Sequence, residues 1–393
     1  MMDYEKLLSG VVSDIPPSGI RKFFDVVNEM DDAISLGVGE PDFITPWTIR
    51  EAGIYSLESG RTYYTSNSGL LELREEIAKY NKRKFGVEYD PKSEILVTVG
   101  GSEAIDLMIR CTINPGDEVL IPEPSFVCYK PCTRLAYGKA VPIETKEEDS
   151  FRLLPEQLKE KITDRTKLLI LPYPNNPTGA VMTREDLEAI AEVLRGTDIL
   201  VLSDEIYGEL RYGDEGHTVF SSIEGMRERT VVVNGFSKAF AMTGWRLGYA
   251  MGPKEIISQM TKVHQYGIMS APTTSQYAAI EALRSCDDDI KEMCTEYNYR
   301  RRVITDGFRK MGLPCFEPYG AFYVFPSIKP LGMSSEEFCM RLLEEEHVAV
   351  VPGTAFGKCG EGFIRCSYAY SIERITEALE RIEKFVNKVS GRK

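Results

Sequence analysis

The two runs DILVLSDEIY (residues 198–207) and TVVVNGFSK (residues 230–238) decide the fold, because each is a short apolar stretch that ends in charged or polar residues. Such a run is typical of a strand buried on both faces of a parallel sheet. The first run stops at Asp204, with Tyr207 three residues later, and the second stops before Lys238. Ligands of open parallel sheets bind beyond the carboxyl ends of the strands. We therefore expect a carboxylate and an amine to face one cavity.

Similar apolar runs flank this pair, namely EILVTVGG (94–101), EVLIPEP (118–124), KLLILPYP (167–174) and GYAMG (248–252). Between them, SEAIDLMIRC (102–111) and TREDLEAIAEVLRG (183–196) have helical spacing. Each of these opens with Ser or Thr followed by acidic residues, which signals the N-cap of a helix. The alternation predicts an α/β fold with a mostly parallel sheet covered by helices. The charged segment 144–150 is interpreted as a solvated loop.

The last hundred residues differ in character. They hold a long polar helical stretch (about 286–311), the aromatic strand-like run AFYVFP (321–326), a helix near 336–346, and FIRCSYA (363–369) before a terminal helix. We expect a small α+β domain at 286–393, after a large domain at 45–285. Residues 1–44 end in the strand-like AISLGVGEPDF and are too short to fold alone. They are expected to pack against the small domain or a neighbouring subunit.

The composition narrows the class of protein. A chain of 393 residues that is 43% hydrophobic can form two domains, and a net charge of −13 argues against a nucleic acid or an anionic membrane surface as the main partner. Nine cysteines without a CxxC pair, and a start without an apolar signal region, favour a reducing, cytoplasmic setting. No apolar run approaches the roughly 18 residues that span a bilayer. His217, His264 and His347 lack ligand spacing, so no metal site is predicted.

The motifs SDEIY (203–207) and GFSKAFAMTGWRLGY (235–249) closely resemble fold-type I pyridoxal-phosphate enzymes, in particular the class I/II aminotransferases. Asp204 precedes Lys238 by 34 residues, and Lys238 precedes Arg246 by 8. Further blocks match in family order, namely GEPDF (39–43), YYTSNSGLLELR (63–74), GGSEA (100–104), NNPTG (175–179) and FIRCSYA (363–369). The resemblance spans nearly the whole chain. It implies a seven-stranded sheet, and pyridoxal 5'-phosphate as the cofactor of the large domain.

The resemblance also implies roles for single residues. Lys238 would carry the cofactor covalently through its ε-amine and then move the substrate proton as a base. Asp204 would pair with the pyridine nitrogen and keep it protonated. Tyr207 and Asn176 would donate hydrogen bonds to the phenolic oxygen of the ring. Phe126 matches an aromatic ring that stacks on the cofactor face.

The cofactor phosphate would bind where a glycine turn leads into a helix, because the N-terminal amides of a helix suit a dianion. The residues implied are Gly101, Ser102, Glu103, Ser237 and Arg246. Tyr64 matches a tyrosine that reaches the phosphate from the other subunit. The resemblance therefore implies a homodimer with shared active sites.

Arg365 is the expected partner of the substrate α-carboxylate. It lies in an otherwise apolar segment, where a guanidinium is costly unless it meets an anion. By resemblance, Asn176 and the backbone at Gly39 would assist. Structural alternatives remain: Lys238 as a solvated strand-end lysine, Asp204 as a helix cap, and Arg365 as one half of an ion pair.

Among the reactions of this family, the motifs favour transamination between an L-amino acid and a 2-oxo acid, with glutamate and 2-oxoglutarate as the expected donor and acceptor. The wider blocks look most like aspartate, aromatic and N-acetyl-diaminopimelate aminotransferases. However, Ser102 stands where some aspartate enzymes have a lysine for the side-chain carboxylate, and residues 266–276 contain no arginine. Strict specificity for dicarboxylates is therefore not expected.

Two other functions are considered. A C–S β-lyase of the cystathionine type would use the same cofactor and lysine, but it would release pyruvate and ammonia without an amino acceptor. A regulator that binds its effector through this fold would carry an added DNA-binding domain. The acidic chain shows no sign of a helix-turn-helix before about residue 14, so a regulator is not expected.

Overall fold

The computed structural model describes residue 2 and residues 4–17, 32–213 and 215–391, and its centre is a seven-stranded sheet. In sheet order the strands are β2 (Ile95–Thr98), β8 (Gly248–Met251), β7 (Thr230–Gly235), β6 (Leu200–Asp204), β5 (Thr166–Leu171), β3 (Glu118–Glu123) and β4 (Lys139–Glu144). The five strands from β7 to β4 run parallel, whereas β8 pairs antiparallel with both of its neighbours. The predicted α/β fold with a mostly parallel sheet is confirmed.

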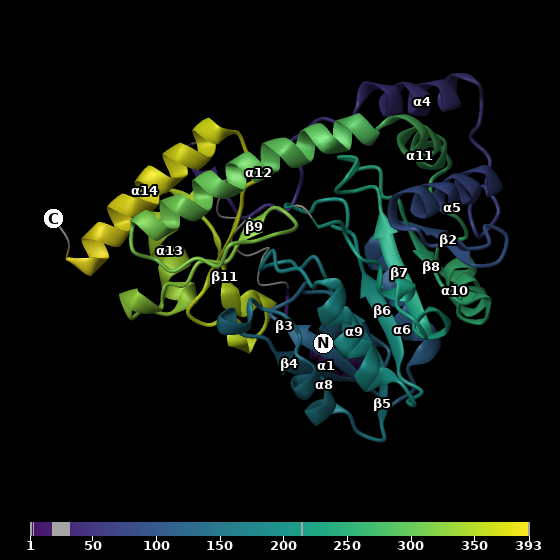
Figure 1. Ribbon diagram of the computed structural model, residues 1–393, viewed down its shortest axis with the longest axis horizontal. Coiled ribbons are helices and arrows are strands. Elements are labelled where there is room, and N and C mark those ends of the chain that lie inside the picture. The colour runs from purple at the N-terminus through teal and green to yellow at the C-terminus, as the bar shows by residue number, and fades with distance from the viewer. Residues whose placement is uncertain (1, 3, 18–31, 214, 392–393) are drawn as a thin grey trace.

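Helices cover both faces of this sheet (Figure 1). One face packs on α6 (Gly101–Thr112), α7 (Tyr129–Leu135) and α10 (Lys254–Gly267), and the other packs on α8 (Pro155–Lys161) and α9 (Arg184–Leu194). Successive side chains of β3 point to opposite faces of the sheet. Val119 packs in the core beneath α6, α7 and α10, and Leu120 packs in the core beneath α8 and α9. The helices α4 (Trp47–Glu58), α5 (Leu71–Phe85) and α11 (Thr273–Ser285) pack together beside β2.

The edge strand β4 was not among the predicted strands. Its side chains are mostly exposed or half-buried, so it has no continuous apolar run. It also contains Pro142, which is tolerated because an edge strand leaves one side unpaired. The charged segment 144–150 begins where β4 ends and contains a single 3₁₀ turn at Glu147–Asp149.

A second group of elements forms around a three-stranded antiparallel sheet. Its strands are β11 (Val351–Pro352), β12 (Ile364–Ser367) and β9 (Tyr323–Val324), and its helices are α12 (Asp287–Lys310), α13 (Ser335–Glu346) and α14 (Ile372–Ser390). In Figure 1 the long helix α12 runs from α11 to the region of α13 and α14. The predicted boundary at residue 285 falls on the last residue of α11. The division of the chain into an arm and two domains stays a prediction.

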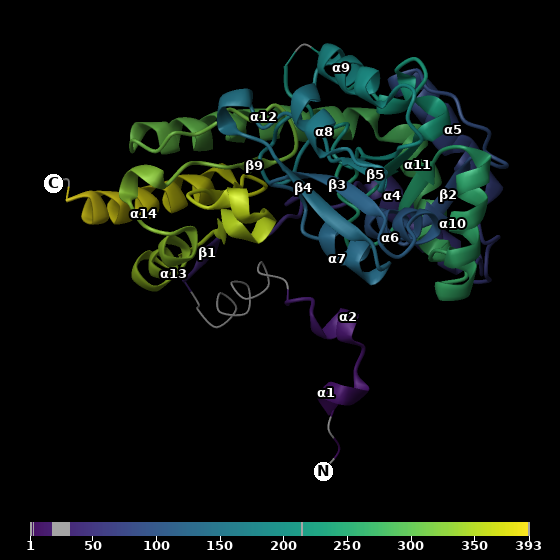
Figure 2. The ribbon, with the colours of Figure 1, turned by 90° about the horizontal axis from the view of Figure 1, so that it is seen from below.

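The N-terminal segment joins this second group through one short strand. Within the strand-like stretch 33–43, only β1 (Ile34–Ser35) is a strand, and it pairs with β10 (Val348–Ala349) in parallel. The short helices α1 (Tyr4–Leu7) and α2 (Gly10–Ser13) project from the rest of the chain in Figure 2. None of the helices in the described ranges is long and apolar enough to cross a membrane.

Candidate active site

A cavity of about 340 Å³ lies at the carboxyl ends of the parallel strands, where the sequence predicts a site. The structure brings eleven of the thirteen predicted site residues into its wall: Gly39, Gly101, Ser102, Phe126, Asn176, Asp204, Tyr207, Ser237, Lys238, Arg246 and Arg365. They come from both groups of elements, since Arg365 lies on β12 and most of the others follow strands of the large sheet. The cavity is therefore built where the two groups meet.

Lys238 follows β7, and its amine points toward the backbone of the N-terminal segment. Its Nζ donates a hydrogen bond to the carbonyl oxygen of Gly39 at 2.6 Å. Burial lowers the pKa of Lys238 to about 8, while Glu40 opposes this shift and Arg365 adds to it. A substantial fraction of the amine is thus neutral at mildly alkaline pH, and the neutral amine is the form that attacks a carbonyl.

Asp204 is a buried carboxylate at the end of β6. Its Oδ2 accepts a hydrogen bond from the hydroxyl of Tyr129 at 2.6 Å, and its Oδ1 accepts one from the backbone N–H of Ile206 at 3.3 Å. Burial raises the pKa of Asp204, and these two hydrogen bonds oppose the shift. Among the described residues, no lysine or arginine forms an ion pair with it. A buried carboxylate in this state suits a ligand with a cationic N–H.

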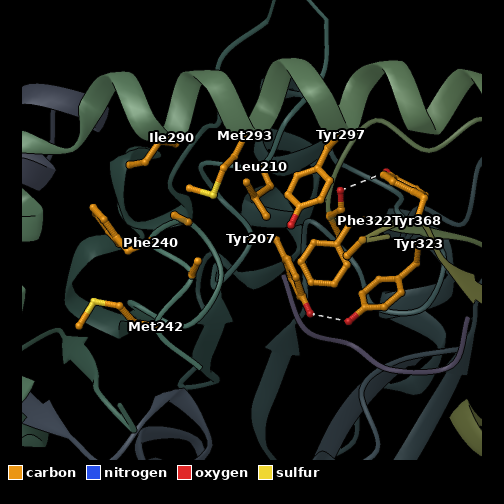
Figure 3. Close-up of a cluster of buried hydrophobic side chains, with 14 of the residues drawn as sticks. Tyr207, Leu210, Phe240, Met242, Ile290, Met293, Tyr297, Phe322, Tyr323 and Tyr368 are labelled. Carbon is orange, nitrogen blue, oxygen red and sulfur yellow. Dashed lines mark hydrogen bonds between the residues drawn. The ribbon is translucent and has the colours of Figure 1, made fainter. Parts of the chain in front are cut away.

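Tyr207 is held by an aromatic cluster beneath α12 (Figure 3). Its hydroxyl lies 3.0 Å from the hydroxyl of Tyr323, and its ring meets the ring of Phe322 edge-on at 5.5 Å. Tyr323 lines the cavity too, although the sequence indicates only a strand for its run AFYVFP. From the sequence, a site role for the Tyr323 hydroxyl could be suspected only because a buried tyrosine hydroxyl usually needs a hydrogen-bond partner.

The start of α6 is open to an anion. The helix begins at Gly101, one residue earlier than the predicted N-cap at Ser102, so that prediction is wrong. The true N-cap is Gly100, with φ 79°, and no side chain caps the helix. Its first amides are therefore left for a ligand, because the initial N–H groups of a helix have no partner within it.

Close packing places a guanidinium beside this helix start. A Cβ on Gly100 would lie 2.8 Å from Nη2 of Arg246, and a Cβ on Gly248 would lie 2.6 Å from the backbone nitrogen of Gly101. Arg246 donates to the carbonyl oxygen of Thr243 at 2.9 Å, and within the described residues it has no carboxylate partner. Glycine at these positions thus lets the helix start and the guanidinium of Arg246 lie close together, an arrangement that suits one anion.

Arg365 is a buried cation in the same cavity wall. It is 2% exposed, its Nη1 donates to Oδ1 of Asn176 at 3.0 Å, and its Nη2 donates to the carbonyl oxygen of Gly37. Its Nε has no hydrogen-bond partner, and the described residues offer it no carboxylate. The rings of Tyr323 and Phe356 lie 4.6 and 4.8 Å from the guanidinium carbon. A buried cation with an unused N–H is matched to a planar anion such as a carboxylate.

Two predicted site residues lie outside the cavity wall. The carboxylate of Glu103 bonds the ring of His264 at 2.6 Å and accepts the backbone N–H of Val99, so only its own amide is left for a phosphate. Tyr64 is 81% exposed. Its predicted role in a neighbouring subunit stays a prediction.

The comparisons with known proteins agree with this geometry. The family model for aminotransferase class I and II matches residues 31–382. A putative aminotransferase of Bacillus subtilis, YugH, is 50% identical over 98% of this chain and 99% of its own, and an aspartate aminotransferase of Pyrococcus abyssi is 48% identical over 94% and 96%. The crystal structure of an aromatic aminotransferase from Pyrococcus horikoshii has a TM-score of 0.90 at 47% identity and covers 93% of this chain and 99% of its own.

Proposed function

The chain belongs to the class I and II aminotransferases, which depend on pyridoxal 5'-phosphate, and we propose that Lys238 carries the cofactor while Arg365 binds the substrate α-carboxylate. It moves an amino group between an amino acid and a 2-oxo acid. One observation supports these assignments most strongly. The same cavity contains Lys238, whose amine has a lowered pKa, and the buried carboxylate of Asp204. It also contains the guanidinium groups of Arg246 and Arg365, each of which suits an anion.

The cavity fits the cofactor group by group. The open helix start at Gly101, together with Ser237 and Arg246, suits the phosphate. Asp204 suits the ring nitrogen, and the wall residues Asn176 and Tyr207 suit the phenolic oxygen. Phe126 lines the same wall and offers a ring for stacking. When bound, the cofactor supplies an electron-withdrawing ring that stabilises negative charge at the substrate Cα.

Each residue then has a distinct task. Lys238, in its neutral form, would hold the cofactor covalently through its aldehyde carbon, with loss of water, and its amine, once freed by the substrate amine, would take the proton from the substrate Cα. Arg365 orients the substrate through a two-pronged contact with its carboxylate, helped by Asn176. Asp204 would hold the ring nitrogen in its protonated form.

We further propose that the preferred amino donor has a neutral, aromatic side chain. The lining cations are Lys238, Arg246 and Arg365, and all three are assigned, so the described lining residues supply no cation for a second carboxylate. Apolar wall residues such as Val38 and Ile105 favour an uncharged side chain. Aspartate-like and N-acetyl-diaminopimelate-like donors are the alternatives, and 2-oxoglutarate is the proposed acceptor.

A spectral titration tests the donor. Cofactor-loaded protein is mixed with phenylalanine, tyrosine, aspartate, glutamate or N-acetyl-diaminopimelate, and conversion to the pyridoxamine form is followed. We expect phenylalanine and tyrosine to half-convert the protein at concentrations about tenfold lower than aspartate, a difference of about 1.4 kcal/mol. Half-conversion by aspartate at the lower concentration would contradict the proposal. Release of pyruvate and ammonia from added cystathionine, without an amino acceptor, would support the β-lyase instead.

The lowered pKa of Lys238 predicts how the cofactor-free protein takes up pyridoxal 5'-phosphate. The neutral amine is the reacting form, so the rate constant should rise with pH and level off above about 8. Free Nα-acetyl-lysine should keep gaining rate up to about pH 10, because its amine has an ordinary pKa of about 10.4. Stopped-flow absorbance measures both. A profile for the protein that follows the free amine would contradict the assignment of the lowered pKa to Lys238.

We also propose that the protein is a homodimer. Large apolar side chains are exposed on two adjoining loops, where Asn67 donates to the carbonyl oxygen of Met269 at 2.8 Å. The exposed residues on and beside these loops are Tyr63, Tyr64, Tyr266, Ile268 and Met269. An apolar patch of this kind is typical of an interface. Light scattering should give twice 44.3 kDa at micromolar concentration, and a mass of 44.3 kDa would contradict the dimer.

A further inference from the structure

We propose that Tyr129 is a positioning residue for Asp204, holding its carboxylate in one orientation and keeping the proton that this carboxylate shares with the cofactor on the ring nitrogen. The inference rests on the proposed role of Asp204. It concerns a residue that the motifs of the chain do not single out.

The geometry around Tyr129 carries the inference. It is the first residue of α7, is 2% exposed, and lies in the wall of the cavity. Its hydroxyl donates to Oδ2 of Asp204 at 2.6 Å, a distance typical of a charge-assisted hydrogen bond from a hydroxyl to a carboxylate. Burial raises the pKa of Tyr129 well above its usual range, so its hydroxyl keeps its proton and remains a donor.

The hydrogen bond fixes one of the two carboxylate oxygens. Oδ2 is held by Tyr129 from α7, and Oδ1 is held by the N–H of Ile206 at 3.3 Å. With both oxygens bound, the carboxylate has one orientation, and its remaining lone pairs are left for the ring nitrogen. The ring of Tyr129 also packs edge-on against the ring of Phe126, with the ring centroids 5.9 Å apart. The same residue therefore contacts the ring that is proposed to stack on the cofactor.

The effect on the shared proton follows from elementary electrostatics. A proton between a carboxylate and a pyridine nitrogen lies on whichever group binds it more strongly. Burial alone makes Asp204 bind a proton more strongly, and a hydroxyl donor to Oδ2 acts in the opposite direction. Without this hydroxyl the proton moves toward the carboxylate, and a neutral ring withdraws electrons from Cα less well.

The test replaces the hydroxyl and reads the ring nitrogen directly. Wild type, Tyr129→Phe and Tyr89→Phe are loaded with pyridoxal 5'-phosphate labelled with nitrogen-15 at the ring, and the nitrogen chemical shift is measured. Tyr89 is the matched control, because its buried hydroxyl donates to Oγ of Ser221 at 2.7 Å and it is not in the cavity wall. We expect a protonated nitrogen in wild type and Tyr89→Phe, and a shift toward the unprotonated value in Tyr129→Phe.

The turnover number kcat should fall in the same variant that shows the change in nitrogen chemical shift. Tyr129→Phe should lower kcat about tenfold with little change in KM, the size expected for one hydrogen bond to a charged group. A nitrogen that stays protonated in Tyr129→Phe overturns the inference, and an unprotonated nitrogen in wild type overturns the role of Asp204 itself. If Tyr129→Phe does not fold, p-aminophenylalanine at this position keeps the shape with a weaker donor. A partial shift then supports the inference, and an unchanged shift overturns it.

Discussion

Lys238→Ala is expected to abolish transamination, with a loss on the order of 10⁴-fold or more, because one residue supplies both the covalent attachment and the proton transfer. The amine lies inside the cavity, 2.6 Å from the carbonyl oxygen of Gly39, and no other lysine lines that wall. The protein should also lose the absorbance band of lysine-bound cofactor. Steady-state assays and absorbance spectra of the purified variant measure both losses.

Lys84→Ala provides the matched control for this variant. Lys84 is a partly buried lysine that pairs with Asp287 at 3.3 Å, away from the cavity. Its replacement should leave the spectrum and the rate close to those of wild type. If Lys238→Ala kept both the absorbance band and the activity, the assignment of Lys238 would be wrong.

Arg365→Ala is expected to raise the KM for the amino acid about 10²- to 10³-fold, which corresponds to roughly 3–4 kcal/mol for a lost charge pair in a buried site. The affinity for the cofactor should change far less, since the phosphate site is built from Gly101, Ser237 and Arg246 instead. Steady-state kinetics measure the first quantity, and equilibrium dialysis of the cofactor measures the second.

Arg229→Ala is the control variant that tells whether Arg365 binds substrate or only stabilises the fold. Arg229 donates to backbone carbonyl oxygens of Leu194, Thr197 and Ile199, and it lies outside the cavity wall. Its loss should lower the free energy of unfolding without raising KM. Equal loss of amino-acid and cofactor affinity in Arg365→Ala would mark Arg365 as a structural arginine.

The main features of the site could be predicted because parallel strands end on one edge. Asp204 and Lys238 each follow a buried apolar run, and the topology of a parallel sheet brings such ends together. The expectation for Arg365 rested on a different argument, the cost of a cation in an apolar strand, and the structure places it in the same wall. Local pattern and the expected parallel sheet were sufficient to place these residues, whereas their individual roles were implied by the resemblance to the family.

Other features depend on contacts that the sequence does not encode locally. Tyr129 bonds Asp204 across 75 residues of sequence, and Tyr323 bonds Tyr207 across 116, so neither pair has a spacing signal. The strand β4 is half-exposed and was not predicted. The helix at Ser102 begins at Gly101 instead, because a glycine takes the N-cap at positive φ and leaves the amides open.

Mapping the lysine that carries the cofactor tests the central claim most directly. The cofactor-loaded protein is reduced with borohydride, digested and examined by mass spectrometry, so that the attached cofactor stays on its lysine. The proposal predicts the added mass on the peptide that contains Lys238 and on no other. Cofactor on a different lysine, or none attached to a protein that still transaminates, would contradict it.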